Sequence, residues 1–423
     1  MALRHAALAL VVAGFAGCRT RPPAPGAELA AVESALREGR IEEAEERIAR
    51  IRAAEPRAVA AAQWAALVAD LTWRDDDAVR AWRVALREPE GAPAPADTVA
   101  ELHGRLGDAL FQAGRFGESI EPLSRGAVGV AAVRRAAFAG LAMVLPYGRK
   151  PTGPLSSEQP LLPGDMPEFV CSAGALSRPF AIDTGTSMTT LSRSFAQQLQ
   201  ASGRRPAGSA LDGAGRELPV EIGVLPKFAI GDIEFGAVPI AIVDDAALQL
   251  RDEHGGPGRV PGGVLGLDLL GTCRLALDPA RRSVALEVPR GLPEAESVQC
   301  VRAEGRCLVP VFVDDVRLWF VLDTGASHSS LTGPGLLRLP GGADRAMPGF
   351  RRVHTVGGSV VAVREVRDLV MRCSFVRFTG VVLPVVERRT TGLFPVHGVL
   401  GVDLLARCRV VLDGGRARLV GLP

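Results

Sequence analysis

Two acidic side chains stand where the chain otherwise has the pattern of buried strands. Asp183 follows three apolar residues in FAIDTGTS, and Asp323 follows three in FVLDTGAS. A buried carboxylate is tolerated when it accepts hydrogen bonds and shares its charge with a partner. Two Asp side chains about 3 Å apart cannot both ionise, so they hold one proton between them. Such a pair predicts acid–base chemistry, in which one carboxylate takes a proton from water and the other donates one to the attacked group.

The residues after each Asp have types that suit a tight, braced loop. Glycine lets the backbone turn and approach a second loop closely. The threonines are expected to hydrogen bond across the two loops, and the serines to donate to the outer carboxylate oxygens. The residues expected to support the loops are Thr184, Gly185, Ser187, Thr324, Gly325 and Ser327.

The two Asp residues belong to two copies of one unit. A strand–turn–strand pattern precedes each Asp. Downstream, GGVLGLDLLGTCRLALD from Gly262 matches HGVLGVDLLARCRVVLD from His397 almost position for position. Two copies on one chain predict two similar β-rich lobes, and a complete site then needs no second subunit.

These features resemble the aspartic proteases of the pepsin and retropepsin type, over residues 165 to 423. The motif GVLGLDLL is more similar to that of the bacterial retropepsin-like enzymes than to that of pepsin. The resemblance implies a mostly-β, bilobal fold with closed-barrel-like lobes at 165–291 and 292–423. It also implies peptide-bond hydrolysis by Asp183 and Asp323 on a peptide or protein substrate, with no cofactor and no metal.

The resemblance also assigns supporting roles outside the two loops. In the family, an apolar-apolar-Gly element forms part of a psi-shaped loop under each catalytic turn. The implied psi-loop residues are Val264, Leu265, Gly266, Val399, Leu400 and Gly401. Asp268 and Asp403 then fall where short helices begin, and we expect them to be N-caps. Pepsin-type flaps carry a Tyr, but the single tyrosine here is Tyr147, outside these lobes. DGAGREL from Asp212 and TVGGSVV from Thr355 are both candidate flap hairpins, with glycines that supply mobility.

The first 18 residues have the pattern of an export signal. Arg4 and His5 precede an apolar stretch too short to span a bilayer. The string FAGC resembles the lipobox of bacterial lipoproteins, which implies lipidation of Cys18 and anchoring to a membrane surface. Arg19 is not the Asp that retains such proteins at the inner membrane. The resemblance therefore implies the periplasmic side of the outer membrane, and an ordinary signal peptide is the alternative.

Residues 28–146 have helical periodicity and precede the β-rich part. A tether at 19–27 leads into them, and a Pro- and Gly-rich linker at 147–164 closes them. Three stretches share a layout, with turn centres near Gly39, Asp75 and Gly114. Their spacing is close to the roughly 34-residue period of helical repeats, and the third resembles a tetratricopeptide repeat. Such modules hold peptides or partner proteins, but generic helical hairpins remain an alternative. The predicted class is therefore multidomain, with all-α TPR-like repeats before a bilobal β region.

Composition excludes other classes of site. The chain has 423 residues, with 49 basic and 47 acidic side chains and a net charge of +2. A nucleic-acid partner would require a clear basic excess. Apart from Cys18 there are six cysteines, an even number that suits disulfides in an exported protein, and Cys300 and Cys307 could close a short loop. Without a CxxC pair or a His cluster, a zinc site is not expected.

Three functions fit these patterns. The first is an exported, membrane-anchored aspartic endopeptidase whose helical repeats recruit protein partners or substrate. The second is a scaffold or binding lipoprotein without turnover, and the third is an assembly factor that cleaves only itself. We favour the first, because a pure binder has no need to bury two facing carboxylates.

Overall fold

The N-terminal part of the protein is built from α-helices, as the sequence predicts. The computed structural model describes residues 26–422, apart from 56–57, 88–94, 146–150, 153–155, 165, 212–216, 250–259, 356–357 and 388–391. The signal segment and Cys18 lie outside the described residues. The helices of this part, here called the helical region, are α1 (Ala27–Arg37), α2 (Ile41–Ala54), α3 (Val59–Leu71), α4 (Asp75–Ala85), α5 (Ala96–Gln112), α6 (Phe116–Arg125) and α7 (Ala132–Ala142).

Consecutive helices pair as hairpins, α1 with α2, α3 with α4 and α5 with α6. Each connecting turn contains one residue with positive φ, at Gly39 (75°), Trp73 (63°) and Gly114 (73°). The helices of the third hairpin approach closely at Gly107, where an added Cβ would lie 2.6 Å from the backbone nitrogen of Leu123. These hairpins coincide with the three similar stretches of sequence. Their membership of the tetratricopeptide repeats stays a prediction.

A ten-stranded sheet, here called lobe 1, follows the helical region, in the order β1-β9-β8-β3-β4-β11-β5-β10-β7-β6. Its strands are β1 (Pro151–Thr152), β3 (Glu168–Ala173), β4 (Leu176–Ile182), β5 (Thr190–Ser192), β6 (Ser202–Leu211), β7 (Glu217–Leu225), β8 (Phe228–Ile230), β9 (Ile233–Phe235), β10 (Val238–Val243) and β11 (Gly263–Leu265). Its short helices are α8 (Arg193–Gln198), α9 (Asp245–Leu248) and α10 (Leu267–Leu270).

An eight-stranded sheet forms lobe 2, in the order β15-β16-β17-β22-β18-β21-β20-β19. Its strands are β15 (Val301–Ala303), β16 (Arg306–Val313), β17 (Val316–Leu322), β18 (Ser330–Thr332), β19 (Met347–Thr355), β20 (Gly358–Cys373), β21 (Val376–Val386) and β22 (Gly398–Leu400). Its short helices are α11 (Gly333–Arg338), α12 (Gly342–Arg345) and α13 (Val402–Leu405).

The two lobes repeat one topology. The order β3-β4-β11-β5-β10-β7-β6 in lobe 1 corresponds strand for strand to β16-β17-β22-β18-β21-β20-β19 in lobe 2. In each lobe the strand that leads to the Asp lies parallel to the psi-element strand, β4 beside β11 and β17 beside β22. The internal repeat of the sequence is therefore a repeat of structure, and it places the two Asp residues at equivalent positions.

A six-stranded sheet joins the lobes, in the order β14-β24-β23-β12-β13-β2. Its strands are β2 (Ser156–Pro160), β12 (Arg274–Asp278), β13 (Ser283–Glu287), β14 (Val298–Gln299), β23 (Cys408–Asp413) and β24 (Arg416–Gly421). The lobes meet where β12 pairs antiparallel with β23. The stretch predicted to be a loop linker thus contains two strands, β1 and β2. A polar edge strand such as SSEQP lacks the apolar alternation from which a strand is predicted.

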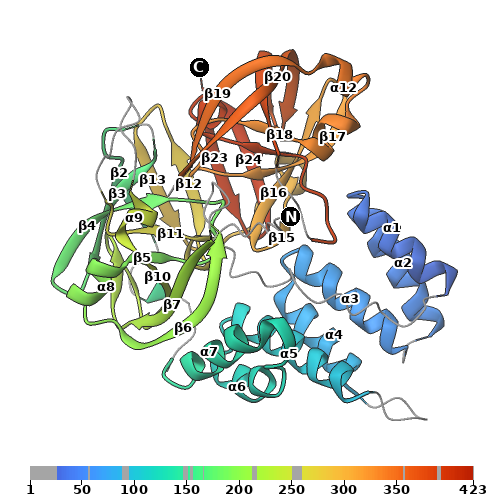
Figure 1. The fold of residues 1–423 in the computed structure, drawn as a ribbon, viewed down its shortest axis with the longest axis vertical. Coiled ribbons are helices and arrows are strands. Elements are labelled where there is room, and N and C mark those ends of the chain that lie inside the picture. Colours follow the sequence, from blue (N-terminus) through green and yellow to red (C-terminus); the bar gives the residue numbers. More distant parts are fainter. Residues whose placement is uncertain are drawn as a thin grey trace, which may run out of the picture.

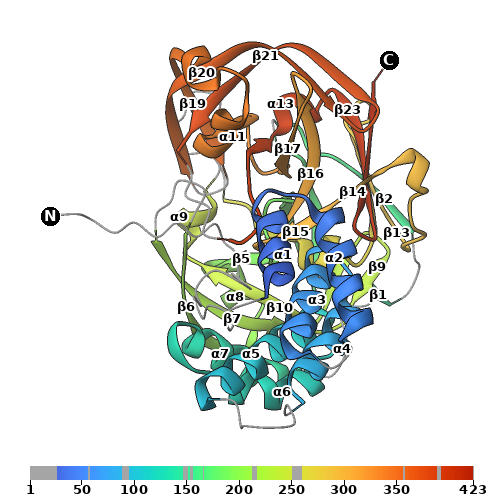
Figure 2. The same ribbon diagram turned by 90° about the vertical axis from the view of Figure 1, so that its right-hand side faces the viewer.

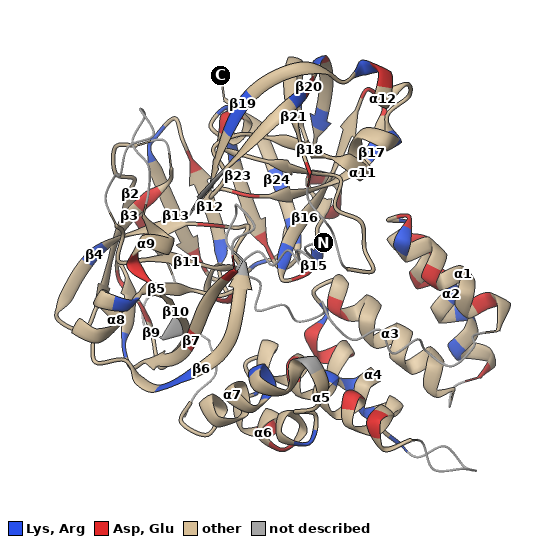
Figure 3. Cartoon of the chain, in the orientation of Figure 1, with Lys and Arg blue, Asp and Glu red and all other residues tan. Residues whose placement is uncertain are grey.

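The helical region lies beneath both lobes and touches each of them (Figure 1). Helix α3 contacts β15 of lobe 2, and α7 contacts β6 and β7 of lobe 1, as can be followed in Figure 2. Acidic and basic residues are interspersed over all three parts (Figure 3). Among the described residues, no helix is both long and apolar enough to cross a membrane.

Candidate active site

Asp183 and Asp323 each sit at the end of a buried strand, directly above a psi element. The backbone nitrogen of Asp183 donates to the carbonyl oxygen of Leu265 at 3.1 Å. The backbone nitrogen of Asp323 donates to that of Leu400 at 3.0 Å. Their side chains are only 6% and 8% exposed. The psi elements therefore fix the backbone position of both Asp residues, in the same way in each lobe.

The two loops interlock through their glycines. A Cβ added to Gly185 would lie 2.6 Å from Cγ of Asp323, and a Cβ added to Gly325 would lie 2.5 Å from Cγ of Asp183. Each carboxylate therefore packs against the backbone of the opposite loop. The structure thus brings together two carboxylates that are separated by 140 positions in the chain.

Both carboxylates accept hydrogen bonds within their own loops. The Gly185 nitrogen donates to Oδ1 of Asp183 at 2.8 Å, and the Gly325 nitrogen donates to Oδ1 of Asp323 at 2.9 Å. The second oxygen of Asp183 accepts from the Thr186 hydroxyl at 2.7 Å. The position equivalent to Thr186 in lobe 2 is Ala326, which has no hydroxyl, so the two halves of the pair are not identical.

Burial, together with the charge of Asp323, raises the pKa of Asp183 from 3.8 to about 7. A hydrogen bond between the two side chains acts in the same direction, while the bonds from Thr186 and Gly185 act against it. A carboxyl group with its pKa near neutrality holds a proton at pH values where an ordinary Asp has lost it. The pair can thus share one proton over much of the acidic and neutral range.

Thr184 and Thr324 hydrogen bond across the loops. The Thr184 hydroxyl donates to the carbonyl of Leu322 at 2.6 Å, and the Thr324 hydroxyl donates to that of Ile182 at 2.7 Å. Each hydroxyl also accepts from the backbone nitrogen of the other threonine, at 3.1 and 3.2 Å. Four reciprocal bonds in a buried setting hold the two loops in one register.

We expected Ser187 and Ser327 to donate to the outer carboxylate oxygens, and this role stays a prediction. In lobe 1 Thr186 supplies a hydroxyl to Asp183, and Ser187 lies against the Gly305 turn of lobe 2. In lobe 2 the Ser327 hydroxyl contacts Nδ1 of His328 and accepts from the backbone nitrogen of His354, both at 2.8 Å. Ser327 therefore ties its loop to strand β19.

Each psi-element glycine supports a catalytic loop through close backbone contact. A Cβ on Gly266 would lie 2.6 Å from the backbone of Met188, and a Cβ on Gly401 would lie 2.6 Å from that of His328. The preceding apolar residues of both elements are buried, namely Val264, Leu265, Val399 and Leu400.

Asp268 and Asp403 are not N-caps, because Gly266 and Gly401 hold those positions. Both carboxylates turn back toward the loops instead. Oδ1 of Asp268 accepts from the nitrogen and hydroxyl of Thr189, at 2.7 and 2.8 Å. Oδ1 of Asp403 accepts the same pair from Ser329, both at 2.7 Å.

Sequence reasoning missed Thr189 and Ser329. Their hydroxyls also accept from the psi glycines, Gly266 at 3.2 Å and Gly401 at 2.9 Å, so each connects a psi element to a loop. A signal was available, since both repeats have a hydroxyl residue two positions after the serine of the Asp-Thr-Gly-X-Ser loop. Only the repeat makes this position stand out.

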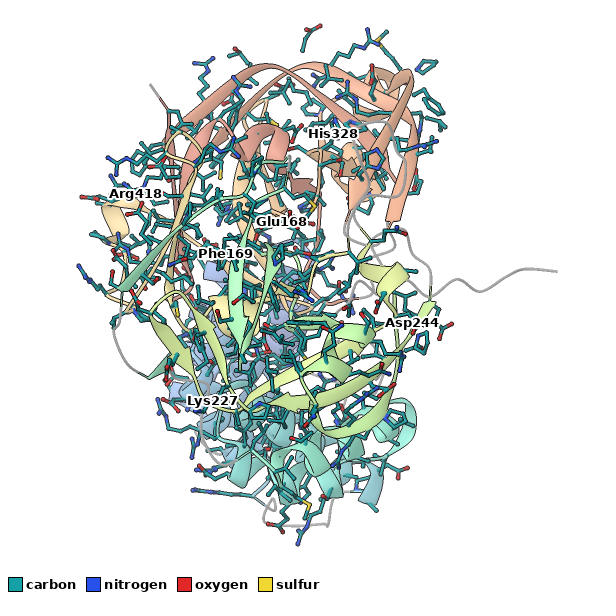
Figure 4. All side chains as sticks on the ribbon, turned by 90° about the vertical axis from the view of Figure 1, so that its left-hand side faces the viewer. Glu168, Phe169, Lys227, Asp244, His328 and Arg418 are labelled. Atoms are coloured by element: carbon teal, nitrogen blue, oxygen red, sulfur yellow. The ribbon has the colours of Figure 1, made fainter. Side chains whose placement is uncertain are left out.

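Both candidate flap hairpins are present as β6–β7 and β19–β20, with tips at 212–216 and 356–357 that lie outside the described residues. His328, labelled in Figure 4, belongs to lobe 2 between its Asp-Thr-Gly loop and β18. His397 is buried, and its Nδ1 accepts from the backbone nitrogen of Trp319 at 3.0 Å. Burial lowers the pKa of His397 to about 4, so it is neutral at physiological pH.

The cysteines of the described residues are buried thiols without disulfide bonds. The pair that could close a short loop, Cys300 and Cys307, is in hydrogen-bond contact, and this contact together with burial raises the pKa of Cys300. Within the same described ranges, no group of three or more His, Cys, Asp or Glu side chains is arranged to hold a metal ion.

One family model matches part of lobe 1. Residues 171–269 match the family model described as Aspartyl protease. This match spans Asp183 and the first psi element. The comparison with curated proteins gave no match.

Solved structures similar to the chain include a retropepsin-like aspartic protease from Rickettsia conorii, at 17% identity and a TM-score of 0.24, covering 33% of this chain and 96% of that one. An aspartic proteinase from Irpex lacteus is 10% identical with a TM-score of 0.40, covering 63% of this chain and 97% of that one. Basic 7S globulin from soybean is 11% identical with a TM-score of 0.35, covering 63% and 94%.

Proposed function

We propose that the protein is an aspartic endopeptidase that hydrolyses peptide bonds with a water activated between Asp183 and Asp323. The observation that carries this proposal is the reciprocal packing of each carboxylate against the glycine of the opposite loop. That packing forces two acidic groups together in a buried setting. A fold has no structural use for such a pair, because facing carboxylates repel each other unless they share a proton.

The pair supplies an acid and a base at one place. In the state with one shared proton, the ionised carboxylate removes a proton from water as the oxygen attacks the peptide carbonyl carbon. The protonated carboxyl donates its proton to the carbonyl oxygen, which gives a neutral tetrahedral diol. In the collapse of the diol, one diol hydroxyl gives its proton to the ionised carboxylate while the other carboxyl protonates the nitrogen, the C–N bond breaks, and the amine leaves with the pair again holding one proton. The Thr184–Thr324 bonds keep the two groups in register throughout.

The proposal extends to location and partners. The lipobox resemblance at Cys18 favours an exported lipoprotein held at the periplasmic side of the outer membrane. The helical hairpins favour recruitment of protein partners or substrate. Any such partner would use the faces of the helical region that do not pack against the lobes.

Single substitutions at the pair test the activity. Asp183→Asn and Asp323→Asn, made separately in the chain lacking residues 1–18, should each lower peptide-library or casein cleavage by at least about 10³-fold. Asp244→Asn and Asp315→Asn are matched controls, because they make the same chemical change at side chains that are 59% and 87% exposed. Asp244 is labelled in Figure 4, beside α9.

Cleavage that survives either substitution at the pair would contradict the mechanism. A wild-type protein that cleaves nothing but retains a protein partner through residues 28–146 would favour the scaffold function instead.

A further inference from the structure

The helical region packs directly against the supports of both catalytic loops. One hydrophobic cluster joins Leu36 and Ile41 of the first hairpin to residues of lobe 2. Among these are Ala326, inside the Asp323 loop, and Val399 of the psi element. The helices of the first two hairpins therefore share a core with the machinery of lobe 2.

A second cluster does the same for lobe 1. It joins Phe111 of α5 and Phe138 of α7 to Ala181, Met188 and Val264. Ala181 lies just before Asp183, Met188 follows the Asp183 loop, and Val264 belongs to the psi element. Apolar contact is non-directional, so these clusters hold the helical region against the lobes but do little to fix its orientation.

Directional contact comes from Arg302, at the centre of β15 in lobe 2. This residue is only 8% exposed. Its guanidinium donates to Asp70 at 2.8 Å and to Asp75, both in the helical region, and lies 4.9 Å from the centre of the Trp73 ring. A planar guanidinium held by two carboxylates and an aromatic face has one orientation, which a lysine would not reproduce.

Strand β15, which carries Arg302, leads into a turn that lies against the Asp183 loop of lobe 1. The β15–β16 hairpin turns at Gly305, where an added Cβ would lie 2.6 Å from Cβ of Ser187. Ser187 is part of the Asp183 loop, so a lobe 2 hairpin touches the catalytic loop of lobe 1. A cavity of about 160 Å³ lies at this junction, lined by residues that include Arg302, Ser187 and Asp268.

We infer that Arg302 is a positioning residue for the Asp183–Asp323 pair, acting through Asp70 and Asp75 to hold the helical region and the β15–β16 hairpin against the back of the catalytic loops. The helical region is then a part of the catalytic unit. The surface that it turns toward the lobes is covered by the lobes themselves. The role in catalysis rests on the proposed function, but the effect on loop order does not.

The test compares Arg302→Met with Arg317→Met in the chain lacking residues 1–18. Arg317 pairs with Glu42 across the same interface, but the two side chains are 39% and 51% exposed, so this pair is a matched control. Hydrogen exchange is measured on peptides covering 183–189 and 323–329, below the unfolding temperature. Arg302→Met should exchange about tenfold faster in both peptides, and Arg317→Met should match the wild type.

Kinetics supply a second readout. Arg302→Met should lower kcat by about tenfold with little change in KM, because substrate contacts are kept while the pair is displaced. Arg302→Lys should recover part of the loss. If Arg302→Met fails to fold, the variant Arg302→Met/Asp70→Asn/Asp75→Asn replaces it, since that variant leaves no unpaired buried charge.

A folded variant of either kind with wild-type exchange in both peptides would overturn the inference. An inactive wild type with faster exchange in Arg302→Met would support the positioning role and count against the proposed protease function. The two failures are thereby distinguished.

Discussion

Gly185 lies in contact with the carboxylate of Asp323, and Gly325 lies in the same contact with Asp183. An added Cβ would come within 2.6 and 2.5 Å of the respective Cγ atoms, a separation that Cβ atoms do not reach without displacing their neighbour. The glycines are therefore required by the approach of the two loops. This contact ties the position of each acidic group to the backbone of the other lobe.

Gly185→Ala or Gly325→Ala should push the opposite carboxylate out of place. Displacement of about 1 Å at reacting groups costs about 10²-fold in rate, so kcat/KM should fall by at least that factor. Gly236→Ala is the control, because an added Cβ there meets no atom within 4 Å. Steady-state peptide cleavage measures the effect. Full activity of Gly185→Ala would show that the loops do not need this contact.

Thr186 should tune the acidity of the pair. Its hydroxyl donates to Asp183 and lowers the pKa of that carboxyl, against the larger effects of burial and Asp323. In Thr186→Val the pKa of Asp183 should therefore rise, and activity should persist to higher pH. Ser124→Ala is the control, because the Ser124 hydroxyl is exposed on α6 and donates to the carbonyl of Ile120. A pH–rate profile of Thr186→Val identical to the wild type would refute this role.

The cross-loop threonine bonds should contribute to stability as well as register. Thr184→Val leaves the buried carbonyl of Leu322 without its donor, and Thr324→Val does the same at Ile182. Each should cost about 1–3 kcal/mol in urea unfolding. Thr184→Ser keeps the hydroxyl and should lose much less. Equal losses for Val and Ser at position 184 would assign the effect to packing.

Two buried groups should give stability opposite dependences on pH. The pKa of Asp183 is raised to about 7, so the folded state keeps a proton that the unfolded state releases, and stability falls as pH rises from 3.8 to 7. The pKa of His397 is lowered to about 4, so the unfolded state takes up a proton that the folded state refuses. His397 therefore costs about 3 kcal/mol as pH falls from 6.5 to 4.

Because these slopes oppose each other, the contributions of Asp183 and His397 should partly cancel in the wild type. Asp183→Asn should be least stable near pH 4, and His397→Gln should be least stable near pH 7. Urea unfolding at half-unit pH steps measures both curves. Parallel curves for the two variants would contradict the opposing slopes.

The sequence was sufficient to predict the order of an all-α part and a bilobal β part, because the internal repeat and the helical periodicity are both long. The repeat also singled out Asp183 and Asp323. The bond from the Thr186 hydroxyl to Asp183 was not predicted, because side-chain direction in a tight turn depends on dihedral angles that residue types do not specify.

Other features depend on contacts between distant segments. Asp268 has the sequence context of an N-cap, but it bonds to Thr189 because β5 happens to pass beside α10. An amphipathic helix pattern shows that one face is buried without saying what covers it, so the hydrophobic cluster that α5 and α7 share with Met188 and Val264 was not predictable. Arg302 gave no signal either, since its partners lie more than 200 positions away.

The pH dependence of kcat/KM for the wild-type protein tests the shared proton most directly. The account predicts a bell-shaped profile whose basic limb falls near pH 7, where the pair loses its last proton, and whose acidic limb marks protonation of both carboxylates. A rate that stays level or rises above pH 8 would contradict the account, because hydrolysis would then proceed with both carboxylates ionised.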